Sequence, residues 1–356
     1  MMNASIEIRR GDEIDEQALL TYLSNIQKVN IDSLKITQFP GGYSNLTYLL
    51  QINEDINWVL RKPPQGANIK SGHDMAREYK IITALKPIFG KVPSPILYYG
   101  DSEILGSEFY IMEKVDGWIL RSEMSVNDLP SESDMKNIFA EFVDGFNLLH
   151  QFDYKNAGLS DLGRPENYIE RQIDGWTQRY YKSKTDEIPS VEKLAKWLEA
   201  HQPIMSGAAL IHNDFKYDNL ILSTSNNSIN AILDWEMSTL GDPLMDLGSS
   251  LGYWVNADDP DWLQKIKLSP TTLPGNPSRE DLLQAYAIKS KLDPSNGVFY
   301  YAYGMLKLAV IAQQIYTRFK LGYTKDPRFA ELIKVVNACG TMGLQAISAK
   351  RLDRLF

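Results

Sequence analysis

The chain has 356 residues, more than twice an average domain of about 150 residues, so we expect two lobes around a shared cleft. It contains 37 Lys and Arg against 45 Asp and Glu, and the resulting net charge of −8 disfavours nucleic acid as a partner. The single cysteine, Cys339, excludes an internal disulfide, and the first residues lack the apolar core of a secretion signal. These features predict a cytoplasmic globular protein.

Hydropathy gives no reason to expect a membrane-bound protein. No run of about 18 uninterrupted apolar residues occurs in the sequence. The most apolar helix candidate, 299–315, contains Lys307, Gln313 and Gln314. It is therefore predicted to be a buried helix and not a membrane span.

The first part of the chain alternates between short strand-like runs and helical patterns. Strand formers and period-two alternation predict strands, and apolar residues at helical spacing predict helices. In chain order these are a helix at 16–26, strands at 34–39, 46–52 and 57–61, a helix at 75–85, and strands at 96–99 and 108–112. We expect an antiparallel sheet lobe with one key helix, spanning residues 1–115.

Beyond Gly117 the helical patterns lengthen. The segments 133–151, 169–181 and 190–201 each carry an apolar face. One exception lies at 209–234, where two short apolar runs flank a polar stretch rich in Asp and Asn, and such loops are a typical place for a functional site. The chain is thus predicted to be α+β and bilobal, with a mostly helical second lobe at 116–356.

The polar stretch contains His212, Asp214 and Asn219 in the order H-x-D-x-x-x-x-N. Phosphoryl transfer to a hydroxyl needs a carboxylate that accepts the proton of the attacking oxygen, and a side-chain oxygen that holds magnesium on the phosphates. Asp214 is the candidate catalytic base and Asn219 is a candidate magnesium ligand. His212 is expected to hydrogen-bond to the backbone and stiffen the loop.

Asp234 ends the second apolar run of this region. A carboxylate there could share the magnesium ion, a hard cation that prefers oxygen ligands. Alternatively, Asp214 and Asp234 are turn or capping residues, which is a common use of aspartate. The ordered set with Asn219 favours the metal site, because kinase signature motifs have this composition and spacing.

A glycine pair lies between two predicted strands, in the stretch PGGYSNLTY at 40–48. Gly42 permits close approach of the backbone, and Ser44 and Asn45 offer hydrogen-bond donors, so this turn is a candidate cover for a triphosphate. A plain hairpin turn is the alternative. The Walker-type sequence G-x-x-x-x-G-K-[ST] is absent.

A cation follows on the next predicted strand, at Arg61 or Lys62. Kinases pair a strand cation on the α and β phosphates with a helix glutamate, and Glu78 lies on the predicted helix. Strand alternation places Arg61 on the same face as Val59, so Arg61 with Glu78 is the favoured pair, although a bulge before Pro63 would reverse this. A surface salt bridge is the alternative.

The stretch YIMEKV at 110–115 runs from an apolar strand towards Asp116 and Gly117. A purine needs backbone donors and acceptors with apolar neighbours. The backbone of Glu113 and Val115 is therefore the candidate site for the base. Simple core packing is the alternative for these residues.

Two further aspartates, Asp242 and Asp246, follow the expected metal ligand. Asp242 precedes a proline and is predicted to initiate a turn, and Asp246 precedes an apolar run and is predicted to cap a helix. Both are expected to be structural, and they could brace the catalytic loop.

These residues, in this order, resemble the aminoglycoside phosphotransferase family of kinase-like small-molecule phosphotransferases, over residues 34–323. The resemblance is more specific to the phosphotransferase domains joined to some acyl-CoA dehydrogenases, which show stretches similar to GGYSNLTY, LRKPP, IHNDFKYDNL and ILDWEMSTLGDPLMDL. It implies a protein-kinase-like fold, with ATP or GTP as phosphoryl donor and Mg as cofactor. It also implies the following roles: Asp214 as base, Asn219 and Asp234 as magnesium ligands, and Arg61 with Glu78 on the phosphates.

Two positions depart from the common pattern of that family. The family commonly has His-Gly-Asp where this chain has Asn213, a change that could alter the loop backbone. Arg61 stands where many kinases have lysine, which keeps the charge but presents a bidentate fork. The dehydrogenase-linked branch often has arginine there, so Arg61 does not indicate an inactive enzyme.

In this family the acceptor lies against the helical lobe. The candidate contacts in this chain are Arg171, Gln172, Trp176, Arg179, Tyr316 and Arg318. Positive and aromatic side chains suit an acid or a CoA ester better than a polycationic antibiotic. The resemblance therefore points to a hydroxylated acyl compound, and surface charges with core aromatics are the alternative.

Two other kinds of protein compete with a small-molecule kinase. A catalytically weak nucleotide-binding pseudoenzyme that regulates a partner is the main alternative, and the complete set of base and metal ligands argues against it. A protein kinase is disfavoured because Asp234-Trp235-Glu236 stands in place of D-F-G and no A-P-E segment follows.

Overall fold

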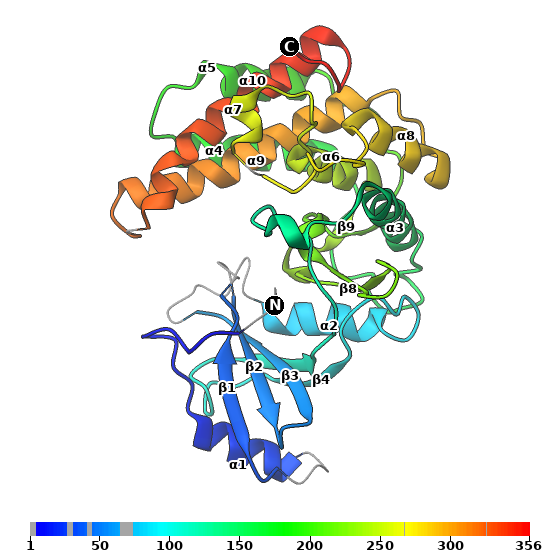
Figure 1. The fold of residues 1–356 in the computed structure, drawn as a ribbon. Coiled ribbons are helices and arrows are strands. Elements are labelled where there is room, and N and C mark those ends of the chain that lie inside the picture. The colour runs from blue at the N-terminus through cyan, green and yellow to red at the C-terminus, as the bar shows by residue number, and fades with distance from the viewer. Residues whose placement is uncertain (1–4, 27–30, 41–44, 65–73, 267, 325) are drawn as a thin grey trace. The chain divides into compact units, whose positions relative to one another are not determined.

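The computed structural model describes residues 5–26, 31–40, 45–64, 74–266, 268–324 and 326–356 (Figure 1). Its contacts divide the described chain into two compact units. Unit 1 comprises 1–119, 156–159 and 219–237, and unit 2 comprises 120–155, 160–218 and 238–356. The segment 219–237 thus belongs with the N-terminal part of the chain, and the lobe boundary expected after residue 115 stays a prediction.

Among the described residues, unit 1 is built on a five-stranded antiparallel sheet with the strand order β1-β2-β3-β5-β4. Its elements are α1 (Glu16–Ile26), β1 (Leu34–Gln38), β2 (Leu46–Ile52), β3 (Ile56–Lys62), α2 (Met75–Leu85), β4 (Pro95–Tyr99) and β5 (Phe109–Glu113). The bounds of α1, β2 and α2 coincide with those predicted from periodicity.

The two faces of this sheet differ in polarity. Leu50 and Leu60 pack with Leu19 and Leu23 of α1 in one buried apolar cluster. Because side chains alternate along a strand, Arg61 points to the other face, where it meets α2. Figure 1 shows both helices beside the sheet. The sheet therefore has an apolar core on one side and a buried charge on the other.

A short hairpin completes unit 1. Its strands β7 (Leu220–Leu222) and β8 (Ile229–Ile232) pair antiparallel, and the turn η3 (Trp235–Met237) follows. Trp118 exchanges two backbone hydrogen bonds with Leu222, of 2.9 and 2.7 Å. These bonds attach the hairpin to the segment that follows β5.

Unit 2 is mostly helical, as predicted. Its elements are η1 (Val126–Asp128), α3 (Glu132–His150), α4 (Tyr168–Ser183), α5 (Pro189–Ala200), β6 (Ala209–Ile211), η2 (Tyr217–Asn219), β9 (Thr239–Gly241), α6 (Pro243–Tyr253), α7 (Asp261–Gln264), α8 (Arg279–Ser290), α9 (Gly297–Lys320), η4 (Pro327–Glu331) and α10 (Leu332–Ala349). The turn η2 ends at Asn219, where the chain enters unit 1. The helix expected at 299–315 lies within α9 and is buried over most of its length.

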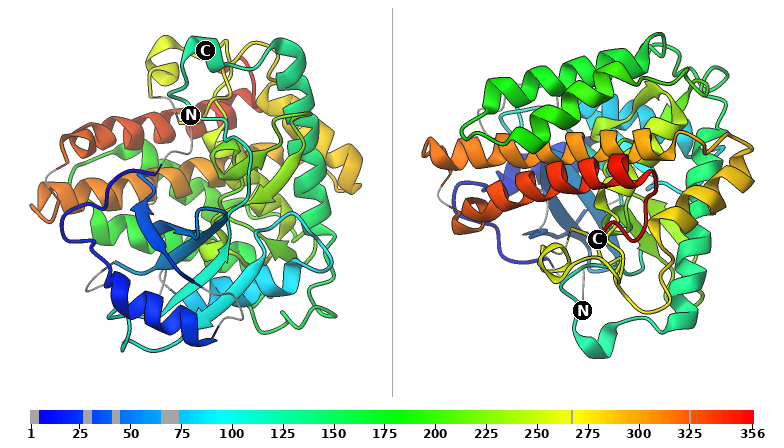
Figure 2. Two further views of the ribbon diagram at one scale, coloured as in Figure 1. Left: turned by 60° about the horizontal axis from the view of Figure 1, so that its bottom comes forward. Right: turned by 90° about the horizontal axis from the view of Figure 1, so that it is seen from above.

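Helix α9 packs against several other helices of unit 2. Figure 2 shows α10 running alongside it, and α6 and α4 also contact it. Its backbone touches that of α6, because a Cβ on Gly304 would overlap the carbonyl oxygen of Gly248, and a Cβ on Gly252 would meet the backbone of Gly304 at 2.9 Å. We call these three residues the glycine seam. Only glycine allows two helices to approach this closely.

Among the residues that the structure describes, one segment has the length and composition of a membrane span. It covers residues 327–349, which include α10, and an 18-residue window within it has a mean hydropathy of 1.2 and is 44% buried inside the structure. The core helices of soluble proteins meet the same criteria, and α10 packs against α9 and α5. The finding is weak evidence for a span, and it falls on a different segment from the most apolar one chosen from the sequence.

Candidate functional site

Three carboxylates of unit 1 lie around the guanidinium of Arg61. Its Nε lies 3.3 Å from Glu78 Oε2, and its Nη2 lies 3.1 Å from Asp234 Oδ1 and 3.8 Å from Glu236 Oε2. Nε and Oε2 are both buried, and their contact is electrostatic and not an aligned hydrogen bond. The structure thus brings Arg61 and Glu78 together, and their role on the phosphates stays a prediction. The sequence did not show that Asp234 and Glu236 share the same cation.

These contacts keep the guanidinium charged. Burial by itself lowers the pKa of Arg61, but Glu78, Tyr110 and the other carboxylates more than offset it, so the pKa lies above its ordinary value. Lys62 points the other way, is buried, and donates a hydrogen bond of 2.7 Å to the carbonyl oxygen of Leu105. The structure therefore selects Arg61 over Lys62 as the partner of Glu78.

The hairpin of unit 1 brings Asn219 and Asp234 together. Leu220 pairs with Ile232, and one residue further the N–H of Leu233 donates to the carbonyl oxygen of Asn219 at 2.8 Å. Asp234 then turns the chain with a φ of 69°, in the left-handed region that aspartate tolerates better than most residues. Its side chain remains 33% exposed. Both predicted magnesium ligands therefore lie at the same end of one hairpin.

The donor set at this end fits magnesium. Across the described residues, no group of three or more His, Cys, Asp or Glu side chains is placed to hold a metal ion. Asn219 and Asp234 offer one amide and one carboxylate oxygen, both hard donors. Magnesium commonly takes one or two carboxylates and completes its shell with phosphate oxygens and water. These residues could hold the ion as part of a nucleotide complex.

The structure describes only part of the predicted glycine-rich turn. Gly42 and Ser44 lie outside the described residues. Asn45 is buried, and its Nδ2 donates a hydrogen bond of 2.7 Å to Glu236 Oε2. Glu236 thus connects the end of this turn to the carboxylates around Arg61. The sequence signal that could have indicated Glu236 is an acidic residue two positions after Asp234.

The predicted purine site lies at the end of β5. The N–H of Glu113 donates to the carbonyl oxygen of Ser94 at 2.9 Å. Val115 packs against an apolar cluster that contains Ile119 and Ile221. The structure thus places apolar side chains beside the predicted backbone positions.

Asp214 lies in unit 2, on the loop between β6 and η2. Lys216 Nζ lies 2.9 Å from its Oδ2 and 3.1 Å from its Oδ1, and also sits 4.5 Å from the centre of the Tyr253 ring. Burial lowers the pKa of Lys216, but Tyr253 and Asp214 more than offset this and raise it above its ordinary value. Lys216 is a charged neighbour of the candidate base that the sequence analysis missed.

A buried carboxylate anchors this loop from α6. Asp246 accepts hydrogen bonds of 2.7 Å from the backbone N–H groups of both His212 and Asn213, and its Oδ2 lies 3.1 Å from His150 Nε2. These hydrogen bonds outweigh the effect of burial and hold the pKa of Asp246 below its ordinary value. His212 Nδ1 accepts from the N–H of Asp214 at 3.3 Å, so His212 bonds to the backbone as predicted.

The helix cap predicted at Asp246 is wrong, because the cap lies at Asp242. Asp242 is the N-cap of α6, accepting hydrogen bonds from the N–H groups of Leu244 and Met245. Asp246 lies inside the first turn of the helix and does not cap it. The error arose because the helix already begins at Pro243, before the apolar run that follows Asp246. The expected bracing of the loop is confirmed for Asp246.

The family follows from comparison with known proteins. A model of the phosphotransferase enzyme family matches residues 35–280. The chain belongs to this family. Among curated relatives, acyl-CoA dehydrogenase family member 11 of Rattus norvegicus is 34% identical over 349 residues, covering 96% of this chain and 44% of the relative. The chain therefore spans less than half of that relative's length.

Solved structures agree on the fold of this phosphotransferase. A candidate aminoglycoside phosphotransferase from Ralstonia eutropha has a TM-score of 0.78 and 28% identity, covering 95% of this chain and 99% of the other. The GDP and kanamycin complex of APH(2")-IIia has a TM-score of 0.62 and 18% identity, covering 91% and 98%. The predicted kinase-like α+β fold is confirmed, with its antiparallel N-terminal sheet and its helical C-terminal part.

The residues predicted to bind the acceptor substrate differ in burial and in the contacts that they make. Trp176 is buried in α4, its Nε1 donates to Gln172 Oε1 at 3.2 Å, and Arg179 lies 4.6 Å from its ring centre. Arg171 is exposed and donates to the carbonyl oxygen of Glu166 at 3.2 Å. Arg318 is exposed near the end of α9. The structure connects Gln172 with Trp176. The role in binding of the six predicted residues, which also include Tyr316, stays a prediction.

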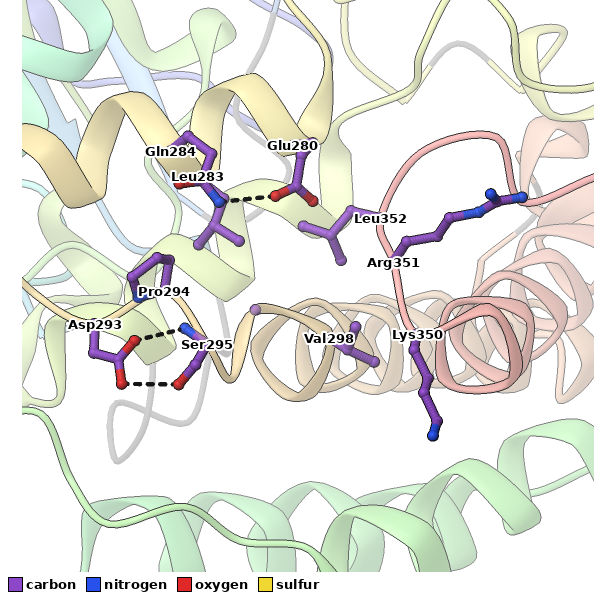
Figure 3. Close-up of a pocket in the computed structure, with 11 residues that line it drawn as sticks. Glu280, Leu283, Gln284, Asp293, Pro294, Ser295, Val298, Lys350, Arg351 and Leu352 are labelled. Carbon is purple, nitrogen blue, oxygen red and sulfur yellow. Dashed lines mark hydrogen bonds between the residues drawn. The ribbon is translucent and has the colours of Figure 1, made fainter.

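A cavity of about 300 Å³ lies elsewhere in unit 2 (Figure 3). It is bounded by α8, the start of α9 and the segment after α10. Asp293 accepts hydrogen bonds from Ser295, and Gln284 donates to Glu280 at 2.9 Å, so these polar groups satisfy one another. None of the residues selected from the sequence lines this cavity. It gives no support to a catalytic role.

Proposed function

We propose that this chain transfers the γ-phosphoryl group of ATP or GTP to a hydroxyl of a small acceptor in the presence of magnesium. The observation that carries the proposal is the buried Arg61–Glu78 pair beside Asp234. Kinases use a strand cation held by a helix glutamate to grip the phosphates next to a metal-binding aspartate. A fold neighbour bound to GDP and kanamycin supports the pairing of a nucleotide with a small molecule.

In unit 1, the proposed roles concern the nucleotide. Arg61 contacts the α and β phosphates, and Glu78 holds its guanidinium in position. Asn219 and Asp234 hold magnesium, which when bound neutralises charge on the transferred phosphoryl group. Further proposed contacts are Gly42, Ser44 and Asn45 over the phosphates and the backbone of Glu113 and Val115 at the base.

In unit 2, the proposed role of Asp214 is general base. Its carboxylate orients the acceptor hydroxyl and takes its proton as the oxygen attacks phosphorus. Lys216 touches both carboxylate oxygens and so limits rotation of the side chain.

The proposed acceptor is a hydroxylated acyl compound bound near Arg171, Gln172, Trp176 and Arg318. The cationic and aromatic side chains of α4 support it, because they favour an anionic group with an apolar chain. Curated relatives named as acyl-CoA dehydrogenase family members agree with acyl chemistry. A polycationic acceptor would be repelled by the same arginines.

The test is a panel of hydroxyacyl-CoAs, choline, aminoglycosides and sugars, assayed with Mg·ATP and Mg·GTP for nucleoside diphosphate release and for the phosphorylated product. We expect transfer to a hydroxyacyl-CoA. Asp214→Asn should abolish turnover and leave nucleotide affinity within about threefold, because it removes the base but no phosphate contact. Asp174→Asn, an exposed acid of α4, is the matched control and should retain full activity.

The possible results separate the alternatives. Activity confined to aminoglycosides would contradict the acyl acceptor. Full activity of the Asp214→Asn protein would contradict the proposed base. Nucleotide binding without turnover on any acceptor would instead indicate a regulatory pseudoenzyme.

A further inference from the structure

We propose that Lys307 is a positioning residue for the loop that carries Asp214, acting from α9 on the backbone of Asn213. The proposal rests on the proposed function, in which Asp214 is the general base. Lys307 would set the orientation of that base without touching a substrate. Nothing in the sequence motif indicates this role, because Lys307 lies 94 residues from Asn213.

The ammonium of Lys307 lies among three acceptors from Asn213 and Ser249. Its Nζ lies 2.6 Å from the carbonyl oxygen of Asn213, 3.3 Å from Asn213 Oδ1 and 3.0 Å from Ser249 Oγ. The side chain is only 4% exposed. A lysine ammonium has three donors, and three acceptors of unit 2 surround it. This arrangement fits a group that holds the loop better than one that binds a ligand.

Two oppositely charged side chains bind the backbone of Asn213, one at its N–H and one at its carbonyl oxygen. Its N–H donates to Asp246 Oδ1 at 2.7 Å, and its carbonyl oxygen accepts from Lys307. Its φ of 67° lies in the left-handed region, which costs a residue with a Cβ about 1 kcal/mol. The two charged contacts stabilise this turn, and Asp214 is the next residue. The direction of the Asp214 side chain therefore depends on both contacts.

The packing of α6 against α9 sets the distance between Asp246 and Lys307, the two charged residues that bind the backbone of Asn213. Asp246 lies two residues before Gly248 on α6, and Lys307 lies three residues after Gly304 on α9. The helices touch at the glycine seam, which contains these glycines. A change in the position of one helix would therefore move one anchor relative to the other.

The charge of Lys307 depends on its surroundings. Asp246 faces it from α6, Asp214 and Lys216 from the loop, and Arg179 from α4, where the ring of Trp176 also lies 5.8 Å from Nζ. Burial lowers the pKa of Lys307 to about 8, although the two aspartates oppose the change. The ammonium is thus mostly protonated at neutral pH, and its hold on Asn213 should weaken as the pH rises above 8.

The first test is amide hydrogen exchange of residues 209–217 in the full chain. Lys307→Met removes the ammonium and keeps an unbranched side chain, and we expect exchange of the loop at neutral pH to become about tenfold faster. Lys320→Met makes the same substitution on the same helix at an exposed site paired with Asp186. This control should leave exchange of the loop unchanged.

The wild-type protein supplies a second measurement that does not depend on a variant folding. Exchange is followed from about pH 7 to about pH 9.5 and divided by the intrinsic chemical rate at each pH. We expect an additional acceleration above pH 8 that is confined to the loop. Loop exchange that stays the same in both experiments would overturn the proposal.

Turnover provides a third readout, using the acceptor identified by the panel above. We expect kcat to fall in Lys307→Met with little change in KM for nucleotide, and Lys307→Arg to restore part of kcat and extend activity above pH 8, because arginine stays charged. An unchanged kcat with a loosened loop would overturn the positioning role. A wild-type protein without turnover would refute the proposed function, and exchange alone would then decide whether Lys307 anchors the loop.

Discussion

The two units each contain a buried centre of charge, and the centres differ in what the charges contact. In unit 1, Arg61 contacts the side chains of Glu78 and Asp234. In unit 2, Asp246 and Lys307 contact mainly the backbone of one loop. The first centre consists of side-chain partners, whereas the second is attached to the main chain.

The difference indicates that the charged side chains of unit 1 are suited to binding a ligand, and that those of unit 2 are suited to fixing the conformation of a loop. Asp234 is one-third exposed and can exchange a partner when a ligand arrives. Asp246 is fully buried, and releasing it would leave two backbone N–H groups without a partner. Unit 1 therefore has charges that can rearrange, and unit 2 has charges that fix a conformation.

The largest effect on stability should come from Asp246→Ala. It removes the acceptor of the two buried N–H groups of His212 and Asn213 and the partner of His150, so we expect the free energy of unfolding to fall by about 5 kcal/mol. Urea unfolding measures this. Asp144→Ala, at a half-exposed pair with Lys289, is the control and should cost less than about 0.5 kcal/mol. If Asp246→Ala lowers the free energy of unfolding by less than about 1 kcal/mol, the charges of unit 2 do not fix the conformation of the loop, and the proposed difference between the units is wrong.

Arg61→Met should have the next largest effect. It leaves Glu78 buried without its cation, which should lower the free energy of unfolding by about 4 kcal/mol. The same variant should lose affinity for Mg·ATP in calorimetry if Arg61 contacts the phosphates. The double variant Arg61→Met with Glu78→Gln removes both charges and should recover much of the stability while still failing to bind nucleotide. Equal losses in the single and double variants would show that the two residues are not coupled.

The pH dependence of stability gives a third comparison. The pKa of Lys307 is lowered to about 8 in the folded protein from 10.5, so between these pH values the unfolded chain binds the extra proton and the contribution of Lys307 to stability rises with pH. The free energy of unfolding of wild type minus that of Lys307→Met should increase by about 3 kcal/mol over this range. Activity should change in the opposite direction. A flat difference curve would show that folding does not change the pKa of Lys307.

The smallest effects are expected at Asn213. Asn213→Gly and Asn213→Ala both keep the backbone contacts to Asp246 and Lys307 and both lose the Oδ1 acceptor of Lys307. Glycine adopts a φ of 67° freely, so Asn213→Ala should be about 1 kcal/mol less stable than Asn213→Gly. Thermal unfolding of both variants tests this. Equal stability of the two would show that the left-handed conformation does not limit the loop.

Local patterns were sufficient for much of unit 1. Apolar periodicity defined α1 and α2 to the residue. Asp74 is the N-cap of α2, and its side chain accepts a hydrogen bond from the N–H of Arg77. Strand alternation correctly favoured Arg61 over Lys62. These features depend on residues close in sequence, which is why they could be predicted.

The remaining contacts depend on residues far apart in the chain. Glu236 and Asn45 are 191 residues apart, and Lys307 and Asn213 are 94 residues apart. No local pattern distinguishes such a buried lysine from others on an apolar helix, and its partner is a carbonyl group that every residue has. Helices α8 and α10 were not predicted either, because their buried faces are defined by neighbouring helices.

The glycine seam has a consequence for how sequence changes would affect this protein. A single added methyl at Gly248 would act as a spacer between α6 and α9. It would alter the distance between the Asp246 carboxylate and the Lys307 ammonium, which bind the N–H and the carbonyl oxygen of Asn213. A Gly248→Ala protein could thus keep every residue of the proposed active site and still present its base in the wrong direction.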